Sequence, residues 1–320
     1  MNIPILGMDE LAAKSPTLGN KVKNLAVLTQ KGVRVPRGFG LPYEVYVSHI
    51  TVLKPAMQQA REQADSYADM SRRLQEVILS APFGGSSNVL RALDEHMPGA
   101  THFAVRSSGA PVISGKQAVE DSAELSLAGQ FESFLLVPAH NVPDVILLCY
   151  ASLFSERCLR QFNVMEDASY LNSRMSVLVQ EMYQADLSAV VMTRDPVEGG
   201  DNFGIEITYG ACEALVSGEL QGDLYLLSRT TGDVLDKQLG TKNAYIKHEP
   251  LVDLKADNKK SHPLPDDMRN SYAASQGLID EIYSLGMRIE SYYNAPQDIE
   301  LVVVDNEIIV VQTRPITAGK

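Results

Sequence analysis

The sequence has few cysteines and no long apolar run, and each shortage excludes a class of protein. Its three cysteines, Cys149, Cys158 and Cys212, are odd in number and lack the close pairing of a zinc site, so we expect reduced thiols. No apolar stretch reaches the ~20 residues that a membrane-spanning helix needs. The N-terminal segment MNIPILGMDE lacks the basic start and apolar run of a signal peptide. These absences predict a cytoplasmic protein that does not span a membrane.

Positive charge is also scarce. The chain has 28 lysine and arginine residues against 40 aspartate and glutamate residues, a formal net charge of -12. A nucleic-acid or anionic-membrane partner would need a basic face, so neither partner is expected. A nucleotide ligand is not excluded, because a few clustered lysines and arginines can reverse the local potential. The 320 residues, 45% of them hydrophobic, suffice for one large domain or two modest ones.

The order of the predicted elements indicates an α+β chain. Helical patterns cover three stretches, of which the first begins at Pro55: 55–79, 143–163 and 265–293. After Met175 the pattern changes to short β-rich runs separated by turn residues, as in a mostly antiparallel sheet. We therefore predict two lobes, residues 1–175 and residues 176–320, with a hinge near residues 165 to 180.

The strongest chemical pattern lies in a predicted hairpin near the C-terminus, with Asp305-Asn306 as its turn. Asp298 and Glu300 share one face of the first strand, because side chains two residues apart point the same way. Gln312 and Arg314 do the same on the second strand. Carboxylates with an amide oxygen suit Mg²⁺, and a guanidinium neutralises phosphate. A salt-bridged strand edge is the alternative, but the flanking apolar runs would bury these groups, which is costly without partners.

Two further segments could approach phosphate oxygens. In FAVRSSG an apolar strand is expected to end at Arg106, which would project a guanidinium and two hydroxyls from the strand tip. In Ser126–Gln130, Gly129 would let the backbone approach a ligand closely, and small loops with inward N–H groups bind phosphates. An ordinary serine and glycine turn is the alternative for this loop.

A lysine and a strand end complete the candidate residues. In LGNKVKNLAVL, Lys21 follows Gly19 at a predicted helix start, where an ammonium group can lie near a bound phosphate. A solvated lysine is the alternative. In VLVQEMY, an apolar strand is interrupted at Gln180-Glu181, and the end of such a strand could supply the backbone donor, backbone acceptor and apolar slot that adenine needs. An ordinary edge strand is the alternative there.

The order and spacing of these pieces resemble the N-terminal nucleotide-binding domain of the phosphoenolpyruvate synthase, pyruvate phosphate dikinase and rifampin phosphotransferase family. The resemblance extends over residues 14–317. The matching pieces are LGNKVKNL, VPRGF, FAVRSS, the ED…AGQFESFL run, VQEM, VMTRDP, GACEALVSGE and QDIELVV…IIVVQTRPIT.

The resemblance implies an ATP-grasp fold whose two lobes clamp Mg-ATP. Phosphate, ribose, adenine and metal contacts then fall on residues that the motifs already contain. The implied phosphate contacts are Lys21 and Arg106, with Arg314 against the transferred group; all three are the implied catalytic residues. The phosphate and ribose side would be lined by Gly129 and Ser133, and adenine would be read by Gln180, Glu181 and Met182. The implied Mg²⁺ ligands are Glu300 and Gln312, and Glu213 is a further nucleotide contact.

Three departures from the family pattern accompany the resemblance. Residues are inserted within GAPVISGKQAV, which follows the arginine motif, so the loop over the phosphates is expected to differ. Cys212 stands where the family usually has glycine, and Gly222-Asp223 replaces the usual Pro-Asp.

None of the six histidines sits in the glycine-rich, threonine-containing segment that accepts phosphate in the complete enzymes. We therefore expect an ATP-dependent phosphotransferase that donates a phosphoryl or pyrophosphoryl group to a histidine on a separate domain or partner protein. A further acceptor-binding domain would complete the reaction. One alternative is a stand-alone ATP-grasp kinase or ligase acting on a small molecule. Another is a non-catalytic nucleotide-binding module.

Overall fold

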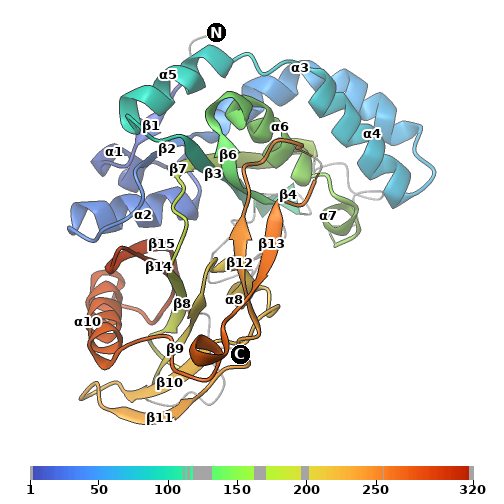
Figure 1. The fold of residues 1–320 in the computed structure, drawn as a ribbon. Coiled ribbons are helices and arrows are strands. Elements are labelled where there is room, and N and C mark those ends of the chain that lie inside the picture. Colours follow the sequence, from blue (N-terminus) through green and yellow to red (C-terminus); the bar gives the residue numbers. More distant parts are fainter. Residues whose placement is uncertain are drawn as a thin grey trace. The chain divides into compact units, whose positions relative to one another are not determined.

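The chain forms two compact units, each built from separate stretches of sequence (Figure 1). The computed structural model describes residues 3–110, 112–113, 116–117, 132–161, 171–195, 202–254 and 256–316. The first unit draws on residues 1–27, 37–182 and 250–256, and the second on residues 28–36, 183–249 and 257–320. Each unit combines an antiparallel sheet with helices, so the predicted α+β class is confirmed.

The first unit contains a five-stranded antiparallel sheet in the order β1-β2-β7-β3-β6. Its strands are β1 (Leu6–Gly7), β2 (Gly38–Leu41), β3 (His102–Ala110), β6 (Ser133–Pro138) and β7 (Arg174–Glu181). A separate short ribbon pairs β4 (Val112–Ile113) with β5 (Lys116–Gln117). Because β7 is the central strand of this sheet, residues 176–181 belong to the first unit by their pairing. The division into lobes of residues 1–175 and 176–320 stays a prediction.

The two faces of this sheet differ in what covers them. Phe39, Phe103 and Val179 point into the large apolar core that the long helices complete. The opposite face receives the start of α2, since a Cβ on Gly40 would meet Leu18 and Val22. The helices are α1 (Glu10–Lys14), α2 (Asn20–Gln30), α3 (Tyr43–Glu62), α4 (Tyr67–Ser80), α5 (Ser86–His96), the 3-10 turn Ala139–Asn141, α6 (Val142–Ser152) and α7 (Glu156–Gln161).

The first helical stretch of the sequence is placed differently from the prediction. Pro55 does not begin a helix but lies inside α3, and a break at residues 63–66 precedes α4. A new N-cap explains the break, because Ser66 accepts a hydrogen bond from the backbone N–H of Asp69. In the described part of the chain, no helix combines the length and the apolar character that crossing a membrane requires.

The second unit contains a six-stranded antiparallel sheet in the order β11-β10-β9-β8-β14-β15. Its strands are β8 (Leu187–Met192), β9 (Asn202–Tyr209), β10 (Asp223–Ser228), β11 (Val234–Gln238), β14 (Gln297–Val304) and β15 (Glu307–Pro315). The other elements of this unit are the ribbon of β12 (Ala244–His248) and β13 (Lys259–Pro263) and the helices α8 (Glu213–Val216), α9 (Asp266–Arg269) and α10 (Gln276–Tyr293).

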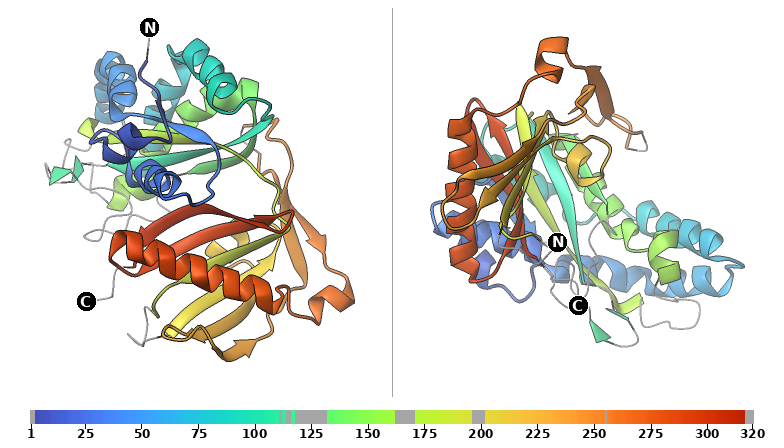
Figure 2. Two further views of the ribbon diagram at one scale, coloured as in Figure 1. Left: turned by 90° about the vertical axis from the view of Figure 1, so that its left-hand side faces the viewer. Right: turned by 90° about the horizontal axis from the view of Figure 1, so that it is seen from below.

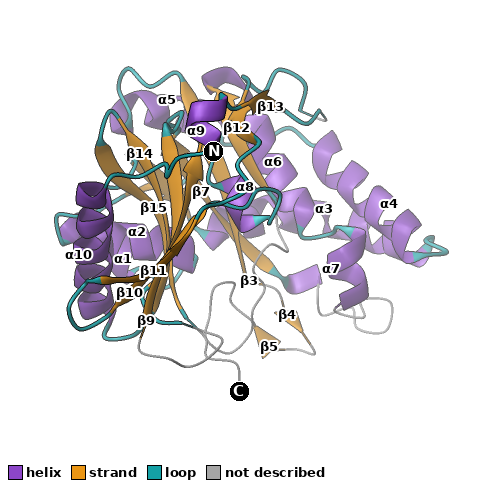
Figure 3. Cartoon of the chain, turned by 60° about the horizontal axis from the view of Figure 1, so that its bottom comes forward, coloured by secondary structure: helices purple, strands orange, loops and turns teal. Residues whose placement is uncertain are grey.

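Helix α10 covers one face of this six-stranded sheet (Figures 2 and 3). A Cβ on its Gly286 would lie 2.6 Å from the Phe203 ring and 3.5 Å from the Val191 side chain, so the backbone of the helix packs directly on these two side chains of the sheet. Directly opposite residues of an antiparallel pair share a face, and Val191 lies opposite Ile299. Ile299 therefore faces α10, and its neighbours in sequence, Asp298 and Glu300, point to the other face.

The hairpin between β14 and β15 has the turn that the sequence predicts. Asp305 and Asn306 have φ angles of 51° and 63°, as a two-residue turn with positive φ at both positions requires. The turn fixes the register as far as Leu301 opposite Val310. A β-bulge at Val311 then shifts the pairing by one residue, which sets Glu300 opposite Gln312 and Asp298 opposite Arg314. The predicted convergence of these four residues is confirmed.

A buried ion pair fixes the start of β10. Lys242 and Asp223 are both fully buried and bonded to each other. The same carboxylate accepts hydrogen bonds from the backbone N–H groups of Gly240 (2.9 Å) and Ala273 (2.7 Å). Burying a charge without such partners is costly, so this carboxylate ties three segments of the second unit together.

Removing one partner of this pair should destabilise the chain strongly. Lys242→Met leaves the Asp223 carboxylate buried without its counter-charge, and we expect the free energy of unfolding to fall by about 3–5 kcal/mol. Urea unfolding followed by far-UV circular dichroism measures the change. The exposed Lys247→Met is the control and should stay within about 0.5 kcal/mol of wild type. Equal stability of the two variants would contradict the assignment.

Candidate nucleotide-binding site

Polar residues of the first unit gather on the sheet face that α2 approaches. Arg106 on β3 lies opposite Leu178 on β7 and opposite Ser133 on β6. Gln180 lies two residues beyond Leu178 on the same face, so it is a diagonal neighbour of Arg106, within about 7–8 Å. Arg106, Ser133 and Gln180, predicted separately from three motifs, therefore occupy one surface.

The lysine motif joins the same face through Gly19. A Cβ there would lie 1.9 Å from the Ser108 Oγ, so only glycine permits this approach. The backbone N–H of Gly19 donates to the Ser176 Oγ (2.8 Å), which donates to the Ser108 carbonyl (3.3 Å). Helix α2 begins at the next residue and carries Lys21, only 9% exposed, so the alternative of a solvated lysine does not apply.

The strand that carries Arg106 does not end there, as the sequence had suggested. β3 continues to Ala110, because residues 107–110 keep their pairing with β7. The serines of FAVRSSG are therefore sheet residues, and the Ser107 hydroxyl donates to the Glu132 carbonyl at 2.7 Å. Judged by apolar residues alone, β3 would end too early, because its last residues are polar and yet remain paired within the sheet.

Gln180 is nearly fully buried, and its Oε1 has no hydrogen-bond partner among the described residues. The next two residues are already engaged. The N–H of Glu181 donates to the Arg37 carbonyl (2.8 Å), and the N–H of Met182 donates to the His102 carbonyl (3.1 Å). Arg37 also holds the Glu181 carboxylate through two bonds of 2.9 Å. Arg37 lies in the VPRGF motif, but its partner was not foreseen.

In the second unit, two cross-strand pairs lie on the sheet face opposite α10. Arg314 donates to Asp298 through its Nε (2.8 Å) and Nη2 (2.7 Å). Gln312 donates from its Nε2 to the Glu300 Oε1 at 3.1 Å. Asp298 and Gln312 are buried, at 8% and 7% exposure. The two pairs are neighbouring rows on this face, so an arginine and a carboxylate–amide pair face the same space.

This donor set fits Mg²⁺ that takes other ligands from a nucleotide. Within the described ranges, no group of three or more histidine, cysteine, aspartate and glutamate side chains is arranged to hold a metal by itself. Mg²⁺ is usually bound through one or two carboxylates, substrate phosphates and water. Glu300, with the amide of Gln312 beside it, would supply the protein part of such a set.

An apolar patch adjoins these polar rows on the same face. Val190 lies opposite Glu300, and Val302 lies one side chain further along β14. The patch has three buried members, Cys212, Val302 and Ile309, and five partly buried ones: Tyr183, Ala185, Val190, Val304 and Val311. Apart from Cys212, none of these residues stands out in the sequence. Alternation along β14 could have revealed Val302.

Glu213 lies beside this patch but is held by its own partners. Its carboxylate accepts from the His248 Nε2 (3.0 Å) and is bonded to the Lys259 Nζ (3.1 Å). Burial raises the pKa of Glu213, but the bonds to His248 and Lys259 outweigh burial, and the net pKa lies below its ordinary value of 4.5. The stabilisation that these bonds give to the folded state is therefore complete above the ordinary pKa of 4.5. It is lost as the pH falls through the lowered pKa of the folded state.

The two substitutions relative to the family pattern have structural counterparts. Cys212 fills the apolar patch with a side chain that glycine lacks. The N–H of Gly222 donates to the Glu206 Oε1 at 2.9 Å, a bond that a proline could not make. Gly129 lies outside the described residues, as do residues 111, 114–115 and 118–119 of the segment that carries the insertion.

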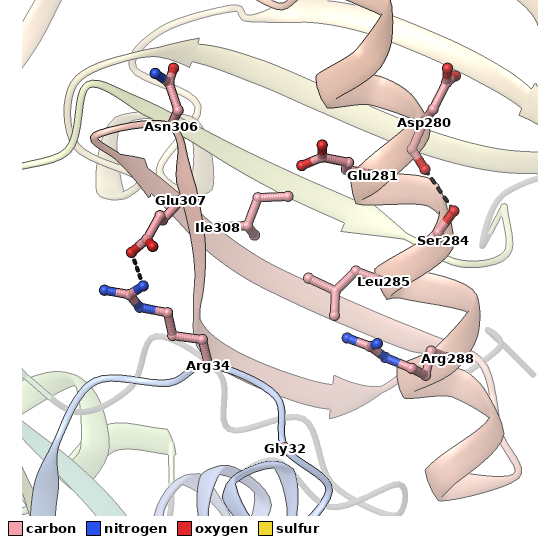
Figure 4. A pocket seen from close by; sticks show the side chains of 10 residues that line it. All are labelled: Gly32, Arg34, Asp280, Glu281, Ser284, Leu285, Arg288, Asn306, Glu307 and Ile308. Carbon is pink, nitrogen blue, oxygen red and sulfur yellow. Dashed lines mark hydrogen bonds and ion pairs between the residues drawn. The ribbon is translucent and has the colours of Figure 1, made fainter.

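A pocket of about 630 Å³ lies on the other side of the second-unit sheet (Figure 4). Its walls come from α10, the hairpin turn and residues 32–34, with Leu285 and Ile308 as apolar lining. Arg34 and Glu307 form an ion pair at its edge. Ile308 lies opposite Val303. Val303 is four residues after Ile299 on β14 and therefore lies on the same face, the one that α10 covers. The pocket is therefore separated by the sheet from Glu300 and Gln312.

Comparison with known proteins identifies the family. The sequence profile described as pyruvate phosphate dikinase, AMP/ATP-binding domain, matches residues 15–320. A probable phosphoenolpyruvate synthase of Methanothermobacter thermautotrophicus is 30% identical over 98% of this chain and 45% of its own length. A rifampicin phosphotransferase of Bacillus subtilis is 26% identical over 99% of this chain and 36% of its own length. The chain thus spans less than half the length of these relatives.

The chain belongs to the family of pyruvate phosphate dikinase AMP/ATP-binding domains. The resemblance inferred from the sequence is confirmed, and the match supports ATP as a ligand. Among solved structures, the D-alanine-D-alanine ligase of Helicobacter pylori is similar with 12% identity and a TM-score of 0.28, over 77% of this chain and 53% of that one.

The contact beneath Lys21 can be tested by filling it. Gly19→Ala places a methyl group against the Ser108 hydroxyl, and we expect a loss of about 1–3 kcal/mol in the free energy of unfolding. Thermal or urea unfolding measures it. The control is Gly84→Ala, where a Cβ meets nothing within 4 Å. If Gly19→Ala is as stable as the Gly84→Ala control, the steric explanation is wrong.

Proposed function

We propose that this chain binds Mg-ATP as an ATP-grasp unit and donates a phosphoryl or pyrophosphoryl group to a histidine on another domain or a partner protein. The observation that carries the proposal is the β14–β15 register, which sets Glu300 opposite Gln312 and Asp298 opposite Arg314 on one face. Membership in an AMP/ATP-binding domain family supports the nucleotide. Relatives named phosphoenolpyruvate synthase and rifampicin phosphotransferase support the reaction class.

In this proposal the first unit contacts phosphates and adenine. Lys21 and Arg106 neutralise phosphate charge, with Ser133 and Gly129 lining the phosphate and ribose side. Gln180, Glu181 and Met182 form the adenine contacts. The N–H groups of Glu181 and Met182 already donate to protein carbonyls. Their carbonyls and the Gln180 Oε1 are therefore the proposed acceptors for the 6-amino group of adenine.

The second unit would contribute the metal and the charge that transfer requires. Glu300 and Gln312 hold Mg²⁺, which shields the charge of the phosphate oxygens when bound. Arg314 faces the transferred group, released in part from Asp298. In phosphoryl transfer, positioning and charge neutralisation supply most of the catalysis. Two arginines, one lysine and the two proposed metal ligands, Glu300 and Gln312, are suited to that task.

Thermal unfolding with and without Mg-ATP tests the proposal. A ligand at one hundred times its dissociation constant stabilises the native state by about 2.7 kcal/mol, which corresponds to several degrees for a chain of this size. The shift should require magnesium. Glu300→Gln should remove most of the magnesium-dependent part, and Arg106→Ala should weaken the shift at every magnesium concentration.

Glu307→Gln is the matched control, because Glu307 lies on the same hairpin but pairs with Arg34 at the pocket edge. It should keep the wild-type shift. A folded wild type without any shift would overturn the proposal. Release of ADP or AMP that depends on a small molecule and needs no second protein would instead favour direct action on that molecule.

A further inference from the structure

The segment that carries Glu213 is fastened to strand β12 by its backbone. The N–H of Ala211 donates to the Ile246 carbonyl at 2.9 Å. Gly210 has a φ of 79°, and a Cβ there would lie 2.4 Å from the same carbonyl, so glycine is required for the contact. The Ser188 hydroxyl bonds to the Gly210 carbonyl from the sheet. The start of α8 is therefore held in place on two sides.

The side chain of Glu213 is oriented by two residues of the β12–β13 ribbon. His248 and Lys259 lie opposite each other in the ribbon and both reach the carboxylate, at 3.0 and 3.1 Å. An ionised carboxylate only accepts hydrogen bonds, so the His248 Nε2 carries the proton. The His248 side chain is only 3% exposed, whereas that of Glu213 is 39% exposed. The histidine is thus a buried support, and the carboxylate keeps an accessible side.

The position of Glu213 limits what that accessible side can bind. It adjoins Cys212 of the apolar patch, on the sheet face that also carries Glu300. A carboxylate repels phosphate oxygens but accepts hydrogen bonds from hydroxyl groups. In a nucleotide the hydroxyl groups are those of the ribose, and carboxylates recognise ribose hydroxyls in other nucleotide sites.

We propose that His248 and Lys259 are positioning residues that hold the Glu213 carboxylate to accept hydrogen bonds from the ribose hydroxyls of the bound nucleotide. This inference rests on the proposed nucleotide function and adds to it a device for selecting ribonucleotides. The two donors fix the carboxylate rotamer before the nucleotide binds, which lowers the entropic cost of ordering this side chain on binding. Neither donor contacts the nucleotide itself.

Sugar selectivity provides the test, since a purely structural role would weaken all nucleotides alike. Titration calorimetry in the presence of magnesium compares ATP, 2′-deoxy-ATP and 3′-deoxy-ATP. Wild type should prefer ATP to at least one deoxy analogue by about tenfold or more, the usual value of a hydrogen bond to a charged group. His248→Phe and Lys259→Met should each reduce that preference to about threefold or less. His248→Gln should retain it, because the amide Nε2 can still donate.

The ribbon supplies matched controls on its outer side. His262→Phe replaces a histidine that stacks on Tyr245 with ring centroids 5.3 Å apart. Lys260→Met replaces a lysine that pairs with Glu249 at 3.9 Å. Both controls should discriminate as wild type does. Urea unfolding of every variant separates loss of selectivity from loss of folding.

The outcomes separate the two proposals. If wild type selects ATP and the His248 and Lys259 variants select it equally well, the positioning role is wrong. If wild type binds ATP and both deoxy analogues with equal affinity, Glu213 does not read the ribose, and the inference is overturned while the nucleotide function stands. If folded wild type binds none of the three, the proposed function fails and the inference fails with it.

Discussion

The alternation of side chains along antiparallel strands is the constraint on which the rest of this structure depends. Each sheet buries one face in an apolar core, so a shift of one residue in any strand would move its entire apolar set into the wrong layer. The core therefore locks the register, and the register places the polar residues. Phe103, Val105 and Val179 anchor one side of the first sheet, which leaves Arg106 and Gln180 on the other.

Local patterns predicted what local rules decide. The two-residue turn predicts the hairpin, and alternation along β14 predicts that Asp298 and Glu300 share a face. The β-bulge at Val311, which brings Gln312 opposite Glu300, does not follow from either pattern. The end of β3 could not be predicted in the same way. Its partner β7 lies about seventy residues further along the chain, and pairing with β7 keeps Ser107 and Ser108 in the strand. Pro55 misled the helix prediction because tertiary packing outweighs the cost of an internal proline.

The partners of Glu213 show a second limit of sequence reasoning. His248 and Lys259 lie 35 and 46 residues after it, on two strands with an alternation too short and too polar to be distinctive. A lone histidine or lysine at such a distance has no pattern that could connect it to a carboxylate. The resemblance to the family identified Glu213 itself but not its surroundings. A family resemblance identifies individual residues in a sequence, whereas contacts between distant segments are seen only in the folded structure.

The charged groups of the candidate site share one arrangement. Arg314 lies against Asp298, Arg37 holds Glu181, and Glu213 is held by His248 and Lys259. Buried or half-buried charges need partners even without a ligand, since desolvation without compensation costs several kcal/mol per ion (of the order of 2–5). These internal partners keep the side chains in defined rotamers. A ligand then replaces or adds to existing bonds instead of ordering a free side chain, so specificity rests on the geometry of the partners as much as on the residues that touch the ligand.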